Sequence, residues 1–511
     1  MLKTKDHEIN TETTVTSTDP KGDDTPISYR PTDFTDVGQA TLLFELYHKK
    51  LRYSSATGFL KYNGQYWEED DLGAQELSQA LTTAQLNQAT EQLVTARALL
   101  QNTGAALLLD GMSPKIAEGR MNDVQREAYQ AWCQAKEFER FALNRRASKS
   151  ITSTLQEARP LLQINPCMLD KNEYLLCTPA ATYDLRLGLD GAQPHSAEDF
   201  ITKITAVSPG KTGSEIWQKA LNQFFCDDQE LIEYVQQICG LAAIGKIFVE
   251  GLIVAYGCGR NGKSTFWNTI SKVLGIYSGT ISSDVLTCGC QRNVKHDLAE
   301  INGKRFLISA ELQAEDRLND SMLKKLCSTD DISGEKKYKD PLPFTPQHTL
   351  VLYTNHLPKI SASDDGTWRR MILIPFNAQF DGARDVKNFS DYLFSNAGES
   401  ILAWIVEGAK KVIGAKYHLA IPKCVEKAIA EYREQNDWFN QFVSVCCDVD
   451  TDYRVSSSIL YKAYHKYCNE SNEYPRSTTD FYNTLFSKGF EKINLSGRKI
   501  IKGLRLKPNQ E

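Results

Sequence analysis

Leu252-Ile-Val-Ala-Tyr256, followed by Gly257-Cys-Gly-Arg-Asn-Gly262-Lys263-Ser264, is the stretch that decides the fold. It fits the pattern G-x-x-x-x-G-K-[ST] between an apolar run of strand length and a segment, residues 265–274, that favours a helix. In this pattern the glycines let backbone N–H groups turn toward phosphate oxygens, and the positive end of the following helix faces the same point. The alternative is an incidental glycine-rich turn, which the preceding strand disfavours.

This loop predicts a nucleotide site with a bound magnesium ion. Lys263 would reach the β- and γ-phosphates of ATP, and the Ser264 hydroxyl would bind Mg²⁺. The expected nucleotide contacts are Gly257, Gly259, Asn261, Gly262, Lys263, Ser264 and Thr265.

Two later apolar runs end in polar side chains that could complete such a site. Residues 304–310 lead to Glu311, where a carboxylate can hold Mg²⁺ or polarise the attacking water. Ala310 stands where an aspartate is usual, so Glu311 would act alone or with help. The alternative is an ordinary buried strand that ends in a surface glutamate. Residues 349–354 lead to Asn355, which can orient water against a γ-phosphate.

Arg369 and Arg370 precede a further apolar run, residues 371–376. Two adjacent arginines are usually a solvated corner, but in a ring of P-loop subunits an arginine here can reach the neighbour's γ-phosphate. A P-loop kinase or a small GTPase would not need this series of elements. The expected catalytic set is Lys263, Glu311, Asn355, Arg369 and Arg370, with Ser264 and Glu311 at the metal.

Composition limits the class of protein. The 511 residues carry 59 Lys+Arg and 64 Asp+Glu, a net charge of −5, which excludes a chain that is basic throughout but not a local DNA-binding surface. No run approaches the ~18 apolar residues of a membrane span, and the N-terminus lacks the apolar core of a signal peptide. The 13 cysteines form no C-x-x-C pair, which is typical of reduced thiols. We therefore expect no membrane partner and a cytoplasmic location, in a bacterial host.

The sequence divides into four parts. Residues 1–30 are polar and predict a disordered tail, and residues 31–210 predict a mostly helical N-terminal domain. Residues 211–445 contain the alternation of apolar strands and polar helices that is typical of an α/β core, with flanking helices. Residues 446–511 predict a small unit of helices and short strands. From Asp452 onward this unit carries eleven Lys/Arg and six Asp/Glu, a net charge of +5.

Four blocks in order resemble the superfamily 3 helicase core of the phage/plasmid primase–helicase family, which includes poxvirus-type helicase-primases. They are GCGRNGKST, GKRFLISAE, LKKLCSTDDISGEKKYKDPLPFTP, and TLVLYTNHLP with DDGTWRRMILIPF. The flanking regions are similar to that family too, so the resemblance covers residues 35–510. It implies an AAA+-like P-loop core, a helical domain before it, a winged-helix DNA-binding domain over residues 446–511, and assembly into a hexameric ring with 3′-to-5′ movement.

The resemblance also assigns roles to residues. Gly262, Lys263, Ser264 and Thr265 fall to the nucleotide and metal. Glu311 becomes the catalytic acidic residue and Asn355 the polar sensor. Arg369 or Arg370 becomes a finger that acts on the neighbouring subunit.

Two basic segments would contact DNA. In related helicases residues 334–339 correspond to a hairpin that faces the central channel, where three lysines would contact the backbone and a tyrosine could stack or pack. These are Lys336, Lys337, Lys339 and Tyr338. In the C-terminal unit a second helix and a basic wing suit duplex binding through Arg498, Lys499, Lys502 and Arg505. The alternatives are a solvated lysine-rich turn and a winged helix that binds protein.

No segment predicts a primase. Its two metals would need clustered carboxylates, and the D-x-D run, Asp448-Val-Asp450-Thr-Asp452, lies far downstream without a following histidine. We therefore expect a separate primase or polymerase as a partner.

The sequence predicts an ATP- and Mg²⁺-dependent DNA helicase that acts on single-stranded and forked DNA in the replication of a phage, satellite or plasmid. One alternative is an ATP-dependent replication initiator or defence-type switch without processive unwinding. A P-loop kinase of small molecules is another, which the arginine pair, the basic hairpin and the C-terminal unit disfavour.

Overall fold

The computed structural model describes residues 27–289, 294–313, 316–335, 342–360, 365–381, 386–471, 475–495 and 498–508. The chain forms two compact units: Met1–Lys61 with Glu69–Ile164, and Tyr62–Glu68 with Asn165–Glu511. Across these described ranges, no helix has both the length and the apolar character to cross a membrane.

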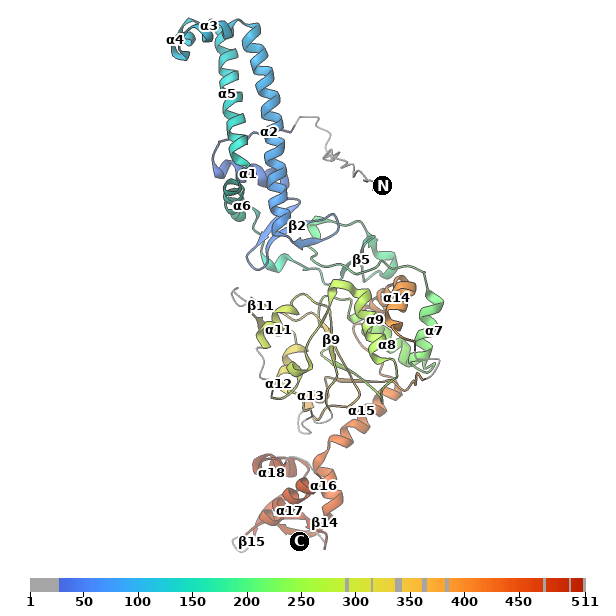
Figure 1. Cartoon of the computed structure of the whole chain (residues 1–511). Helices are drawn as coiled ribbons and strands as arrows, with labels where there is room; N and C mark the ends of the chain where they lie inside the picture. The colour runs from blue at the N-terminus through green and yellow to red at the C-terminus, as the bar shows by residue number, and fades with distance from the viewer. Residues whose placement is uncertain are drawn as a thin grey trace, which may run out of the picture. The chain divides into compact units, whose positions relative to one another are not determined.

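The first unit is built on a long helical hairpin, α2 with α5 (Figure 1). Asp70 accepts a bond from the N–H of Gly73 at the start of α2, and Asn122 with Gln125 forms a capping box at the start of α5. The side chains buried between the two helices include the small Ala89 and Ala142, so the helices can approach closely. The prediction of a mostly helical N-terminal region is confirmed. The elements are α1 (Asp36–Tyr47), β1 (Leu51–Ser54), β2 (Gly58–Tyr62), α2 (Asp71–Asn102), α3 (Ala105–Gly111), α4 (Pro114–Arg120), α5 (Asp123–Arg145) and α6 (Ser148–Leu162).

The second unit contains a five-stranded parallel sheet in the order β13-β7-β12-β9-β8. The predicted α/β core is therefore confirmed. The strands are β7 (Leu252–Tyr256), β8 (Ser278–Thr280), β9 (Phe306–Ala310), β12 (Thr349–Thr354) and β13 (Met371–Pro375). Strand β7, which leads into the glycine-rich loop, pairs with β12 and β13. It does not pair with β8 or β9, although these two strands are nearer to it in the sequence.

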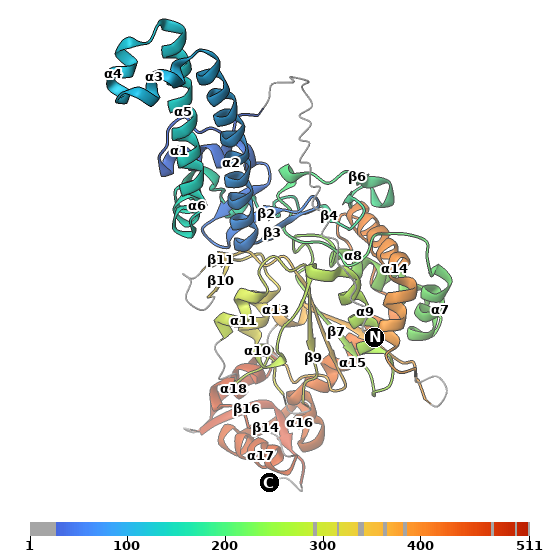
Figure 2. The same cartoon turned by 45° about the horizontal axis from the view of Figure 1, so that its top comes forward.

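Alternate side chains of each strand enter two different cores. Ile253 and Ala255 of β7 pack into one cluster with α7, α8, α9 and α14, whereas Leu252 and Val254 pack into another with α10, α12 and α15. In Figure 2, α10 lies on one side of the sheet, and α7, α9 and α14 lie on the other. The helices are α7 (Ser214–Phe224), α8 (Gln229–Leu241), α9 (Lys263–Leu274), α10 (Ser283–Leu286), α11 (Val294–Glu300), α12 (Asp320–Leu326), α13 (Asp365–Trp368), α14 (Phe389–Gly414) and α15 (Lys423–Asn436). Covering on both faces is why the strands read as continuous apolar runs.

Residues 165–210 fold with the second unit, although the sequence grouped them with the N-terminal domain. Leu176 and Leu185 are buried in the same cluster as α8 and α9, and the N–H of Ala206 donates to the Val273 carbonyl at 3.1 Å. The segment therefore adds a layer to the core. Its strands are β4 (Leu175–Cys177), β5 (Thr182–Asp184) and β6 (Ala192–Gln193), and the unit also includes β3 (Trp67–Glu69), β10 (Ile332–Gly334) and β11 (Leu342–Phe344).

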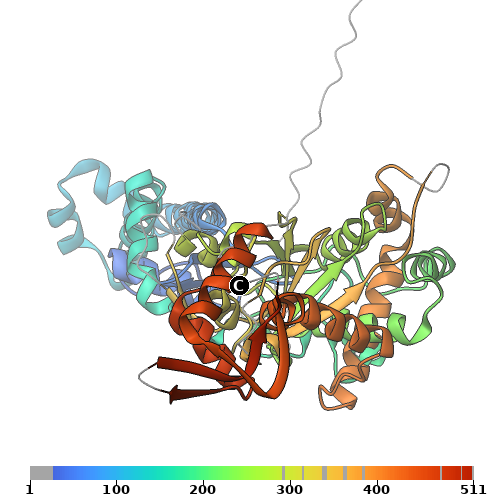
Figure 3. The same cartoon turned by 90° about the horizontal axis from the view of Figure 1, so that it is seen from below.

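The C-terminal unit, residues 438–506, is called the tail below and folds around an aromatic core of its own. Trp438, Phe439 and Phe442 pack against Tyr464 and Phe481, so the tail begins with α16, ahead of the predicted start at residue 446. Its three strands form an antiparallel sheet in the order β14-β16-β15 (red in Figure 3). The elements are α16 (Trp438–Cys446), β14 (Cys447–Ser456), α17 (Ser457–Glu470), α18 (Thr478–Ser487), β15 (Glu491–Leu495) and β16 (Arg498–Leu506).

Candidate functional site

The glycine-rich loop, residues 257–262, joins the carboxyl end of β7 to the first turn of α9. Gly262 has a φ of 78°, and a Cβ there would lie 2.5 Å from the Phe224 ring. A Cβ on Gly257 would lie 2.4 Å from both the Asn261 amide nitrogen and the Phe376 carbonyl oxygen. The two glycines are therefore required by backbone conformation and by close approach.

Lys263 is buried at the centre of this loop, with 6% of its surface exposed. Its Nζ donates to the Gly257 carbonyl at 2.9 Å, to Oδ1 of Asn261 at 2.6 Å and to Oδ1 of Asn355 at 3.1 Å. Burial lowers the pKa of Lys263, and the nearby Cys258 thiol opposes that shift. Three oxygens thus satisfy the three N–H bonds of an ammonium group.

The strand order brings the other predicted groups to the same edge. Thr354 of β12 pairs with Tyr256 of β7, so Asn355 and the glycine-rich loop begin side by side. The Glu311 N–H donates to the Tyr353 carbonyl at 3.0 Å, which anchors Glu311 beside β12. Parallel strands end at a common edge, and that edge is where ligands bind in open α/β sheets.

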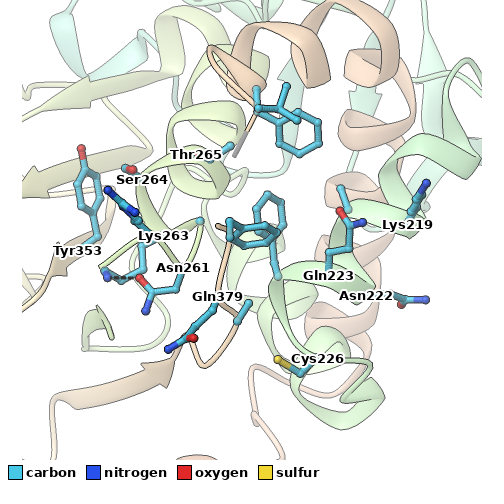
Figure 4. A pocket seen from close by; sticks show the side chains of 18 of the residues that line it. Lys219, Asn222, Gln223, Cys226, Asn261, Lys263, Ser264, Thr265, Tyr353 and Gln379 are labelled. Carbon is cyan, nitrogen blue, oxygen red and sulfur yellow. Dashed lines mark hydrogen bonds between the residues drawn. The ribbon is translucent and has the colours of Figure 1, made fainter. Parts of the chain in front are cut away.

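One cavity of 1560 Å³ collects these residues. Ser264 and Thr265 on the first turn of α9, Glu311 and Asn355 all line it together with Lys263. Figure 4 shows Asn261, Lys263, Ser264 and Thr265 along one wall, with Gln223 of α7 across the cavity. The donor set fits a phosphate group at a helix N-terminus, and the Ser264 hydroxyl with the Glu311 carboxylate fits Mg²⁺, which prefers oxygen ligands and shares them with phosphates.

An apolar wall of the cavity was missed by the sequence analysis. Phe380 and Phe389 are half-buried there and pack against the buried Phe224, with their ring centres 5.8 and 6.4 Å from the centre of the Phe224 ring. The Phe380 N–H donates to the Arg260 carbonyl at 2.8 Å, which ties this wall to the glycine-rich loop. An apolar surface next to the glycine-rich loop suits a nucleobase. No motif signals it, because the three rings come from three separated segments.

The structure distinguishes the two arginines. Arg370 forms an ion pair with Glu250, donates to the Gly366 carbonyl at 3.1 Å, and is half-buried at the start of β13. Arg369 is exposed. The side chain of Arg370 is thus engaged by other groups of this chain, whereas that of Arg369 is exposed to solvent.

The predicted DNA contacts fall in two segments, the hairpin and the C-terminal tail. The hairpin residues Lys336, Lys337, Tyr338 and Lys339 lie outside the described residues. In the tail, Arg498, Lys499 and Lys502 are exposed on β16. Arg505 pairs with Asp448 at 3.0 Å and lies 4.0 Å from the centre of the Tyr453 ring, so its charge is already partnered.

Fold and site together define an α/β protein with a glycine-rich loop, an acid and an amide at the carboxyl edge of a parallel sheet. Three segments match described families: residues 40–226 match a family described as D5 N terminal like, residues 255–370 match a family of unknown function, and residues 434–502 match a family described as poxvirus D5 protein-like. The resemblance to poxvirus-type helicase-primases is therefore confirmed.

Relatives of the chain occur in large DNA viruses and in a virophage. "Putative helicase L207/L206" of Acanthamoeba polyphaga mimivirus is 26% identical over 298 residues, which are 54% of this chain and 30% of that protein. "Putative primase C962R" of African swine fever virus is 22% identical over 291 residues, 52% of this chain and 30% of that protein. "Putative helicase V13" of Sputnik virophage is 25% identical over 27% of this chain and 18% of that protein. The matched region is thus less than a third of each of these relatives.

Among solved structures, the apo structure of the NrS-1 C terminal region is similar to 58% of this chain, over 77% of its own length, with 15% identity and a TM-score of 0.36.

Proposed function

We propose that this chain is an ATP-dependent DNA helicase that works in the replication of a viral or mobile genetic element. The observation that carries the proposal is the network at the sheet edge: Lys263 bonded to Asn355, with Glu311 beside them in one cavity. An ammonium, a carboxylate and an amide around one phosphate-sized cradle are the groups that γ-phosphate hydrolysis requires. The relatives named as helicases and primases support nucleic acid as the partner.

ATP with Mg²⁺ is the proposed substrate. The glycine-rich loop and the first turn of α9 would hold the phosphates, Ser264 and Glu311 would bind the metal, and Phe380 with Phe389 would contact the base. Glu311 would accept a proton from the attacking water, and Asn355 would orient that water. Magnesium would neutralise charge on the phosphate oxygens.

A ring, hexameric and moving 3′-to-5′ as the resemblance implies, is the proposed assembly. Arg369 is exposed at the start of β13 and is the better candidate for a finger that enters the neighbour's site. Arg370 would keep that turn in place through its ion pair with Glu250.

The tail is proposed to bind duplex DNA beside the fork. Its order of elements, helix, strand, two helices and two strands, supports a winged helix, with Arg498, Lys499 and Lys502 on the wing. The pore hairpin remains a prediction from sequence.

A separate primase is proposed as a partner. The Asp448–Asp452 run lies within β14, where the Asp448 carboxylate pairs with Arg505, and this supports a structural role for that run.

The deciding experiment measures ATP hydrolysis with and without single-stranded DNA, strand separation on a forked duplex, and particle mass with ATP and fork by mass photometry. Stimulated hydrolysis, strand separation and a ring-sized particle are expected. Hydrolysis that DNA does not stimulate, with no strand separation, would overturn the helicase proposal. DNA-bound assembly driven by ATP without unwinding would instead support the second candidate, a replication initiator or switch, which the DNA-binding tail favours.

A further inference from the structure

We propose that Asn261 is a positioning residue that couples the amine of Lys263 to strand β13. The inference rests on the proposed nucleotide site. It goes beyond that site because it assigns to the Asn261 side chain the link between the nucleotide site and β13, the strand that follows Arg370. Nothing in the glycine-rich motif requires an asparagine at this position, where the pattern allows any residue.

Both ends of the Asn261 side chain are used. Its Oδ1 accepts from the Lys263 amine at 2.6 Å, and its Nδ2 donates to the Phe376 carbonyl at 2.9 Å. The orientation of the amide follows from its partners, since an ammonium group can only donate and a carbonyl can only accept. Asn261 is 4% exposed, so water does not substitute freely for either partner.

Phe376 is fixed in turn by the sheet. It directly follows β13, and its N–H donates to the Tyr256 carbonyl at the end of β7, at 2.9 Å. The missing side chain of Gly257 leaves room for the Asn261 amide and the Phe376 carbonyl to meet. The contact is therefore built from both sides: a glycine makes the space, and the end of a buried strand supplies the acceptor.

The consequence concerns where the lysine stands before a nucleotide arrives. The Lys263 amine donates to Asn261, which is bonded to the end of β13, and to Asn355 at the end of β12. These bonds place the amine at the loop before phosphate oxygens replace some of its acceptors. Once a nucleotide is bound, its phosphates hold the amine themselves, so the asparagine matters more for capture of the nucleotide than for the later chemical step.

The first test is a comparison of steady-state kinetics with ATP and Mg²⁺. Asn261→Ala removes both bonds and should raise KM by about 10-fold while kcat changes by less than about 3-fold. Asn396→Ala is the matched control, because Asn396 is an exposed asparagine of the same unit whose amide bonds only to the Tyr392 carbonyl of its own helix in the described part of the chain. It should leave both constants unchanged.

A second pair of variants separates coupling from simple loop packing. Asn261→Asp keeps the acceptor for Lys263, loses the donor to Phe376, and adds a negative charge beside the amine. Loss of the bond to Phe376 should therefore raise KM while kcat changes by less than about 3-fold. A side chain that merely fills space would leave KM unchanged, because aspartate has the same shape as asparagine.

Gly257→Ala attacks the same contact from the opposite side. The new methyl would displace the Asn261 amide, so this variant should raise KM as Asn261→Ala does, and the double variant should be no worse than the poorer single variant. Additive effects would overturn the shared-contact inference. Thermal unfolding of each variant identifies loss of fold, and the isosteric Asn261→Asp still tests the coupling if Asn261→Ala does not fold.

The outcomes separate the two proposals. If the unmodified chain hydrolyses no nucleotide, the proposed function fails. If it does hydrolyse ATP, and Asn261→Ala or Asn261→Asp has the original KM, the inference about Asn261 is wrong and the proposed function stands.

Discussion

The glycine-rich loop and the C-terminal tail both carry positive charge, and they hold it in opposite ways. Lys263 is buried, and its amine bonds to oxygens from the loop itself and from the end of β12. Arg498, Lys499 and Lys502 are exposed along one strand of the tail. In the first region the position of one atom matters, and in the second the number of charges does.

This contrast follows from how much water reaches the charged groups in each region. A buried ammonium group must have partners for its donors, because an unpaired buried charge is costly. It is therefore held in one geometry. Exposed lysines attract a phosphate backbone over several ångströms and exchange partners freely, so they contribute in a nearly interchangeable way. Substitutions should accordingly have large, site-specific effects in the core and small, additive effects in the tail.

The largest effect is expected for Lys263→Ala. Loss of the amine removes both a phosphate contact and charge stabilisation in the transition state, so ATP hydrolysis should fall more than about 1000-fold and nucleotide binding should weaken. Hydrolysis assays and equilibrium binding of a fluorescent nucleotide measure the two effects. Lys427→Ala, an exposed lysine on α15, is the control and should be unaffected. Residual hydrolysis above a tenth of the original would contradict the role given to the buried amine.

A second contrast lies within one pair of neighbours, Arg369 and Arg370. Arg369→Ala should lower hydrolysis by about 1000-fold without loss of fold, because an arginine finger stabilises charge on the transferred phosphoryl group. Arg370→Ala should instead lower the free energy of unfolding by roughly 1–3 kcal/mol, because Glu250 and the Gly366 carbonyl lose their donor. Hydrolysis and thermal unfolding of both variants distinguish the two roles.

Mixed assemblies test whether the finger acts between subunits. Combining Lys263→Ala subunits with Arg369→Ala subunits should restore hydrolysis at interfaces where an intact lysine meets an intact arginine. No recovery at any ratio would mean that Arg369 acts within its own subunit or has another role.

The groups at the sheet edge could be predicted from sequence because a local pattern indicates each of them. An apolar run of strand length followed by Lys263, Glu311 or Asn355 predicts a side chain at a strand end, and parallel strands end together. The place of β12 between β7 and β9 could not be predicted from sequence, since strand order depends on packing over both faces.

Other parts could not be predicted because they depend on distant residues. The apolar wall joins Phe224, Phe380 and Phe389 from separate segments, and the bond from Asn261 to Phe376 spans 115 positions. The fold of residues 165–210 with the core likewise depends on long-range burial of Leu176 and Leu185. Local pattern carries no information on such pairings, whereas it does announce strands, caps and glycine-rich turns.

His348, like Lys263, is a base that is buried in the core. Burial lowers the pKa of this fully buried histidine to about 4, from an ordinary value of 6.5. The unfolded chain then binds the proton more readily, so the contribution of His348 to stability is complete above about pH 6.5 and is lost as pH falls toward about 4, by about 3 kcal/mol. Urea unfolding at about pH 7 and about pH 4.5 measures this. His348→Leu should show a smaller change between the two, and an equal change would contradict the assignment.

The smallest effects are expected in the tail, where they test whether its charges are interchangeable. Lys499→Ala and Lys502→Ala should each reduce the slope of log binding constant against log salt by about 0.9 for duplex DNA, with a similar loss on any DNA sequence. Arg505→Ala should change the slope less, because Asp448 already neutralises that charge. Titrations of the full chain at several salt concentrations measure the slopes. A large loss for one lysine and none for the other would mean that the wing, like the glycine-rich loop, depends on the position of a single group, and the contrast between the two regions would not hold.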